Sequence, residues 1–186
     1  GCTGWGYDEV LPYFKKSEAN TDPHLADAFH GRDGPLSVSQ QRDPNAMDHT
    51  FIEAAGKLQF GQCPDFNVED PEGMGIYQVT QKDGRRHSTA AAFLHNITDR
   101  TNLKIVTRST VHTVSTTQDT AHVTLQRPDG TQHIIKARAE VILSAGAIGS
   151  PDILLRSGIG PSAALQSTGT TVVHDLSGVG QNLHDH

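Results

Sequence analysis

The stretch VILSAGAIGSPDILLRSGIG, residues 141–160, decides the fold of this chain. Its first residues, Val141 to Leu143, are apolar and typical of a buried strand. The residues that follow are small, so the backbone can approach another group closely. Ser150 and Pro151 are the residue types that cap and open a helix. The stretch therefore predicts a strand, a loop of small residues and a helix, against which a flat ligand can lie.

A strand-to-helix turn that binds nothing has the same short glycine pattern, because such patterns occur often by accident. Asp152 is expected in the first turn of the helix, where its negative charge argues against an anion site at that helix end. A function for this loop therefore needs support from the rest of the chain.

Strands are expected upstream of this stretch, because apolar and polar residues alternate there. They are predicted at Leu103–Thr107, Thr110–Ser115, Ala121–Gln126, His133–Ala137 and Glu140–Ser144. The turn residues Arg127–Gly130 join two of them into a hairpin, which predicts a local antiparallel meander. Downstream, helices are expected at Pro151–Arg156 and Pro161–Ser167, followed by a strand at Thr171–His174.

The first hundred residues predict helices separated by polar loops. Helical spacing and start signals give Tyr7–Lys16, Asn45–Leu58 and a short helix through Leu94 that Ser88 caps. Short strands are predicted at Leu36–Ser39 and Gly75–Gln81, the second closed by the turn Lys82–Gly84.

The composition excludes several classes of function. The 186 residues carry 15 basic and 21 acidic side chains, a formal net charge of −6, so we expect no nucleic-acid partner. No apolar run reaches the roughly 18 residues that span a bilayer, so no transmembrane segment is expected. Cys2 and Cys63 form neither a disulfide framework nor a zinc motif, which favours a reducing compartment, the cytoplasm.

An ordered series of segments resembles one enzyme family along nearly the whole chain. The segments are Gly4–Glu18, His30–Leu36, Gly73–Gln78, Gly84–Thr89, Gly146–Gly160 and Gly178–Leu183 with Asp185–His186. They are similar to the glucose-methanol-choline (GMC) oxidoreductases, and the fifteen residues Gly146–Gly160 resemble a signature motif of that family.

The resemblance implies a mixed α/β fold, with part of a discontinuous FAD-binding domain and part of a substrate domain built on an antiparallel sheet. Residues 1–100 then correspond to the lid and substrate portion, and residues 101–186 to the FAD-binding portion. The implied reaction is oxidation of an alcohol to an aldehyde, with hydride transfer to the flavin of FAD. The electron acceptor, oxygen, a quinone or another molecule, stays open.

The same resemblance assigns site residues. The backbone of Val111 corresponds to the position that meets the adenine, and Ser144, Ala145 and Gly146 correspond to a strand end beside the adenosine. The family's phosphate loop and catalytic histidine are expected outside this sequence, so no catalytic residue is expected in it. The chain is accordingly expected to be an internal fragment, inactive by itself.

Two other functions remain open. His184 and His186 are two residues apart, a spacing that places both rings on one face of an extended segment, as in some metal-dependent hydrolases. No third ligand is identifiable, so we expect no metal. The chain could instead act as a non-catalytic binding or structural domain. If the protein is a GMC oxidoreductase, both a choline-like alcohol and an aliphatic alcohol are compatible with the sequence as substrates.

Overall fold

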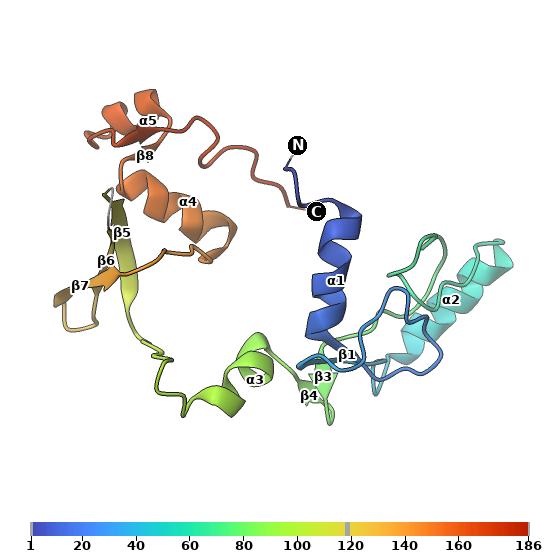
Figure 1. Ribbon diagram of the computed structural model, residues 1–186. Coiled ribbons are helices and arrows are strands. Elements are labelled where there is room, and N and C mark those ends of the chain that lie inside the picture. The colour runs from blue at the N-terminus through green and yellow to red at the C-terminus, as the bar shows by residue number, and fades with distance from the viewer. Residues whose placement is uncertain (1, 118–119, 186) are drawn as a thin grey trace. The chain divides into compact units, whose positions relative to one another are not determined.

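The computed structural model describes residues 2–117 and 120–185. The chain divides into two compact units, Gly1–Lys104 and Ile105–His186, which are described separately below. The elements of the first unit run from blue to green in Figure 1, and those of the second from yellow to red. The assignment of residues 1–100 and 101–186 to substrate and cofactor portions stays a prediction.

The first unit contains short elements joined by long loops. Its elements are α1 (Tyr7–Ser17), β1 (Glu18–Asn20), β2 (Leu36–Val38), α2 (Ala46–Lys57), β3 (Gln81–Lys82), β4 (Arg85–Arg86), α3 (Thr89–Phe93) and a 3-10 turn at His95–Ile97. β1 and β2 pair in parallel, whereas β3 and β4 form a two-residue hairpin. The three predicted helices are confirmed to within one or two residues at each end.

Local signals account for these helices. The Glu9 carboxylate of α1 accepts a hydrogen bond from the backbone of Gly6 at 2.7 Å. Asn45 caps α2 by accepting from the amide of Met47 at 2.9 Å, and Ser88 caps α3 by accepting from Ala91 at 3.3 Å. These bonds satisfy amides that lack partners within the helix, so the boundaries follow from the sequence nearby.

The second unit is built on an antiparallel meander. Strands β5 (Thr110–Thr116), β6 (Ala121–Gln126) and β7 (Gln132–Ala137) lie in that order, and the amide of Arg127 closes the hairpin onto the Thr131 carbonyl at 2.9 Å. The meander and its turn are confirmed. Helix α4 (Gly146–Arg156) packs beside β5, as Figure 1 shows, and α5 (Ser162–Ser167) follows it. The two-residue strands β8 (Ile159–Gly160) and β9 (His174–Asp175) pair in parallel.

Several predicted strands are wrong. In the described residues, Leu103–Thr107 and Glu140–Ser144 form no strand, because neither finds a hydrogen-bonding partner there. Within the predicted strand Gly75–Gln81, Val79 makes an isolated bridge to Ser39 and Gln81 begins the β3–β4 hairpin, while the preceding Met74 makes an isolated bridge to Gln62. The strand expected at Thr171–His174 is replaced by β9. An extended segment becomes a strand only where another segment pairs with its backbone.

The helix at Pro151 also begins earlier than predicted. α4 starts at Gly146, so Ser150 is not its cap and Pro151 lies inside the helix. Pro151 is the sixth residue of α4, so the helix lacks the backbone hydrogen bond that another residue there would donate to the carbonyl of Ala147. No helix of the described residues is both long and apolar enough to cross a membrane.

Candidate functional site

The loop that precedes α4 is open and exposed. Ser144, Ala145 and Gly146 all lie on the surface of the second unit. Gly146 has a φ of 83°, a conformation that side chains with a Cβ rarely adopt, and no atom lies within 4 Å of the position where its Cβ would be. The three residues predicted to bind the cofactor therefore present an accessible backbone.

The first turn of α4 carries no acidic residue and receives no hydrogen bond from a capping side chain. Ser150 instead accepts a hydrogen bond from the amide of Ala145 at 3.0 Å, which fixes the loop against the helix. The sequence predicted Asp152 in the first turn of the helix, and this prediction is wrong. The Asp152 carboxylate pairs with Arg156 one turn further along α4. No acidic side chain therefore compensates the partial positive charge at the start of α4, and an anion can bind near this helix end.

A cavity lies along the same helix. Its volume is about 500 Å³. The helix side is formed by Ala147, Ile148, Pro151, Asp152 and Leu155, and the other side by residues 180–184. Ile148 is 76% exposed, so an apolar side chain next to Gly146 faces this space without protein cover. A ligand at the loop would thus meet backbone groups and an apolar wall.

Val111 lies in β5, the edge strand of the meander. It pairs with Leu125 on one side, and the register shifts between Val111 and Thr113. An edge strand leaves one row of backbone donors and acceptors unpaired by the sheet, and a bulge re-aims the backbone locally. The position predicted to contact the adenine is therefore one where backbone recognition is physically possible.

The structure places Val111 and the loop in one unit but joins them by no hydrogen bond in the described residues. β5 meets the far end of α4, where the amide of Val114 donates to the Ser157 hydroxyl at 2.8 Å. An eleven-residue helix is about 16 Å long, and Ser144 to Gly146 lie at its other end.

The histidine pair receives no support as a metal centre. His184 lines the cavity beside α4, while His186 lies outside the described residues. Among residues 2–117 and 120–185, no group of three histidine, cysteine, aspartate or glutamate side chains is placed to hold a metal ion.

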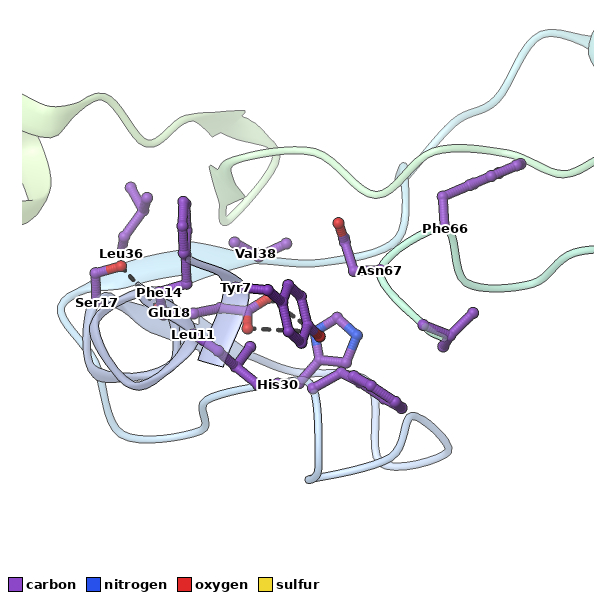
Figure 2. A pocket seen from close by; sticks show the side chains of 12 residues that line it. Tyr7, Leu11, Phe14, Ser17, Glu18, His30, Leu36, Val38, Phe66 and Asn67 are labelled. Carbon is purple, nitrogen blue, oxygen red and sulfur yellow. Dashed lines mark hydrogen bonds and ion pairs between the residues drawn. The ribbon is translucent and has the colours of Figure 1, made fainter. Parts of the chain in front are cut away.

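A second cavity, of about 420 Å³, lies in the first unit. Tyr7, Leu11 and Phe14 of α1 form one part of its apolar wall, and Phe66 and Asn67 belong to a loop distant in sequence. Figure 2 shows the Glu18 carboxylate pointing toward the ring of His30 at one side of this cavity.

His30 belongs to a buried cluster that the sequence analysis did not identify. The ring is 2% exposed, and its Nδ1 lies 3.0 Å from Glu18 Oε1 while its Nε2 lies 2.9 Å from Asp65 Oδ2. Burial by itself lowers the pKa of His30, but the hydrogen bonds and negative charges of Glu18 and Asp65 outweigh it, so the pKa is raised. The available signal was the histidine that opens the segment His30–Leu36.

The glycines of that segment have a steric role. A Cβ on Gly31 would lie 1.8 Å from the Lys15 carbonyl oxygen, and one on Gly34 would lie 2.3 Å from the Ser17 carbonyl carbon. The loop therefore packs directly on the backbone at the end of α1. This close approach carries the neighbouring His30 to Glu18.

Comparison with protein families gives one match over the full sequence. The family model described as GMC oxidoreductase matches residues 1–186. Among curated proteins, an alcohol dehydrogenase [acceptor] of Pseudomonas putida is 38% identical over 98% of this chain and 33% of its own length. An oxygen-dependent choline dehydrogenase of Sinorhizobium fredii is also 38% identical, over 100% of this chain and 33% of its own.

Solved structures give a consistent result. Pyridoxine 4-oxidase from Mesorbium loti superimposes with a TM-score of 0.81 and 31% identity, over 93% of this chain and 34% of that one. An FAD-dependent oxidoreductase from Chaetomium thermophilum superimposes with a TM-score of 0.82 and 30% identity, over 100% of this chain and 34% of that one. The chain spans about a third of the length of the relatives that it matches.

Proposed function

The chain belongs to the GMC oxidoreductase family, and from this premise we propose that the protein oxidises the CH–OH group of an alcohol to an aldehyde. FAD is the cofactor of the family to which the chain belongs. We propose that these 186 residues supply part of the cofactor site and part of the substrate scaffold, whereas the residue that removes the alcohol proton lies outside them.

The open loop before α4 is the observation that carries this proposal. We assign Ser144, Ala145 and Gly146 to the adenosine end of FAD, because all three residues are exposed and the space beside Gly146 is open. Val111 is assigned to the adenine, which its position on an edge strand supports.

The flavin ring, when bound, accepts the hydride from the alcohol carbon. The residues of this chain bind and orient the cofactor. The uncompensated first turn of α4 favours a nearby negative charge, and Ile148 with Pro151 shields one side of the space from water.

The substrate class is proposed as a choline-like or aliphatic alcohol. The two curated relatives, named as alcohol and choline dehydrogenases, are equally identical to this chain, so neither substrate is favoured. The electron acceptor is left unassigned. A cytoplasmic location is proposed from the two free cysteines, exposed Cys2 and buried Cys63.

The test is flavin binding by the protein expressed from its complete reading frame. We expect visible absorbance bands of oxidised flavin that are bleached by the alcohol substrate without oxygen. A folded product without flavin, and without affinity for added FAD, would contradict the proposal.

A matched pair of substitutions tests the site itself. Ala145→Glu places a carboxylate on the exposed loop, and we expect it to weaken FAD binding at least tenfold, because it opposes the anionic cofactor. Ala145→Gln, of nearly equal size and no charge, should retain most of the affinity. Equal affinity of the two variants would remove the loop from the cofactor site, even if the protein binds FAD.

A further inference from the structure

The buried cluster of the first unit shares no residue with the proposed cofactor site. We propose that Glu18, His30 and Asp65 form a proton-dependent clasp, in which a positively charged His30 holds the loop Cys63–Val68 against β1 at the edge of the cavity. When His30 loses its proton, the loop is released. The first unit then carries a conformational response to pH.

Counting hydrogens identifies His30 as an imidazolium. Asn20 Nδ2 lies 3.2 Å from His30 Nδ1, but its two hydrogens have acceptors at Glu18 Oε1, 3.0 Å away, and Gln78 Oε1, 2.7 Å away. Nδ1 therefore donates to Glu18, the acceptor left to it. Nε2 faces the carboxylate of Asp65, which when ionised only accepts. Both ring nitrogens thus carry a proton.

The carboxylates are held in place by other bonds. Glu18 Oε2 accepts from the amide of Gly31 at 2.9 Å. Asp65 is 7% exposed, and its Oδ1 accepts from the amide of Asn67 at 2.9 Å. Two fixed carboxylates on opposite edges of one buried ring require a positive charge between them, because a bare ring nitrogen would face a carboxylate oxygen.

The hydrogen bond between His30 and Asp65 attaches the loop that contains Asp65 to the N-terminal part of the first unit. In the described part of the chain, it is the one hydrogen bond that joins residues 62–68 to residues 1–39. The remaining bonds of that loop are internal or reach Met74: the Cys63 thiol donates to the Asp65 carbonyl, and the Cys63 amide donates to Met74. Loss of one proton therefore weakens the one polar attachment of a wall of the cavity.

Other titratable groups around the ring are engaged elsewhere or uncharged. Tyr7, labelled in Figure 2, lines the same cavity as His30. Lys15 of α1 donates to the backbone carbonyls of Asp27 and Ala28, and Arg32 pairs with the Asp27 carboxylate at 2.7 Å. Beyond β2, His87 accepts from the Ser37 amide. Among the titratable groups of the described residues, Glu18 and Asp65 are the two that bond to the ring directly.

The direction of the response follows from the raised pKa of His30. The unfolded ring has a pKa near 6.5. The clasp is therefore complete below about pH 6.5, and it is lost as the pH rises through the higher folded value. Strong acid weakens it again once the two carboxylates are protonated.

Nitrogen-15 spectra of the histidine side chains test the charge directly in the unmodified protein. At pH 7.0 we expect both His30 nitrogens in the chemical-shift range of imidazolium. A neutral His30, with one protonated and one bare nitrogen, would overturn the proposal. This measurement requires no variant.

Hydrogen exchange tests the release of the loop. After correction for the intrinsic pH dependence, protection of residues 62–68 should fall as the pH rises from 6 to 9, while protection of β5–β7 stays constant. Asp65→Asn should speed exchange of the loop by roughly tenfold at pH 7, as expected when a bond to a charged group is lost, and should lower the pH of the transition.

Asp70→Asn is the matched control, because Asp70 lies on the exposed surface of the same region of loop. It should leave both the exchange rates and the transition pH unchanged. If residues 62–68 of the unmodified protein keep the same protection across this pH range, or if both variants behave alike, the clasp does not exist.

Discussion

The two units of the chain bury different kinds of side chain. Among residues 2–117 and 120–185, the buried apolar residues of the second unit are large, namely Val114, Leu125, Ile153 and Leu165, whereas those of the first are Ala55, Cys63 and Ala92. In the same described residues, the buried polar side chains, Asn20, His30, Ser37 and Asp65, all lie in the first unit.

This difference separates two sources of stability. Apolar burial stabilises through the area removed from water and depends little on pH. A buried polar cluster stabilises only while each member keeps its partner and its charge, because an unsatisfied buried group is costly. We therefore expect the second unit to behave as a pH-independent scaffold for the cofactor, and the first as the part that responds to conditions.

Truncation in the apolar core should have the largest effect. Leu125 is 5% exposed in the central strand β6, so Leu125→Ala leaves a cavity and should lower the free energy of unfolding by about 2–5 kcal/mol. Urea denaturation followed by exchange in β5–β7 measures this, and the loss should be the same at pH 6 and pH 8.5. Ile134→Ala on β7, at a 71% exposed position, is the control and should change stability by less than about 0.5 kcal/mol. If the loss of unfolding free energy in Leu125→Ala depends on pH, the second unit is not stabilised by pH-independent apolar burial.

Removal of one polar partner in the first unit should cost less but should depend on pH. Asn20 is 4% exposed and bonds to Glu18 and Gln78, so Asn20→Ala leaves buried groups unsatisfied and should cost about 1–3 kcal/mol. Thermal unfolding at several pH values measures the change. Asn96→Ala, at an exposed position, is the matched control and should be nearly neutral. A cost at Asn20 that is constant with pH would indicate that the cluster contributes packing alone.

A hydrogen-bonded serine in the second unit tests whether polar contacts there are also independent of pH. The Ser157 hydroxyl accepts from the Val114 amide at 2.8 Å and donates to the Ile153 carbonyl at 2.6 Å, so it ties α4 to β5. Ser157→Ala should cost about 1 kcal/mol, independent of pH, because both partners are uncharged. Ser167→Ala, which removes an exposed hydroxyl bonded to Ala164, should cost less. If the two variants are equally stable, the link between helix and sheet rests on apolar contacts.

The features that could be predicted from the sequence are those with local causes. α1, α2 and α3 have their caps within a few residues, and the hairpin between β6 and β7 has its turn at Arg127–Gly130. Features that depend on distant partners were missed. The strand predicted at Glu140–Ser144 had the right apolar pattern but finds no partner in the described residues. The strand predicted at Leu36–Ser39 is confirmed as β2, but its three-residue partner β1 and the two-residue strands β8 and β9 have no pattern long enough to predict them.

The candidate site likewise has features that could be predicted from nearby residues and features that could not. The loop of small residues before α4 was visible because small residues and a helix follow each other directly, although the helix starts at Gly146 and not at Pro151. The proposed contacts of Val111, Ser144 and Ala145 involve backbone atoms, so their side chains carry no signal, and those assignments rest on resemblance. The clasp joins residues 35 positions apart, His30 and Asp65, and no spacing rule connects them.

The smallest predicted effect is a gain of stability, and it tests whether α2 of the first unit depends on packing at all. Ala55 is the one buried residue that this helix contributes, and a Cβ on Gly56 would meet no atom within 4 Å. Gly56→Ala should therefore raise the free energy of unfolding by about 0.5–1 kcal/mol, since alanine loses less backbone entropy in a helix. Gly31→Ala is the opposite control, because its Cβ would collide with the Lys15 carbonyl. If Gly56→Ala destabilises the protein in urea denaturation, the exposed face of α2 is covered by another part of the molecule, and the first unit is less dependent on its polar cluster than the contrast with the second unit implies.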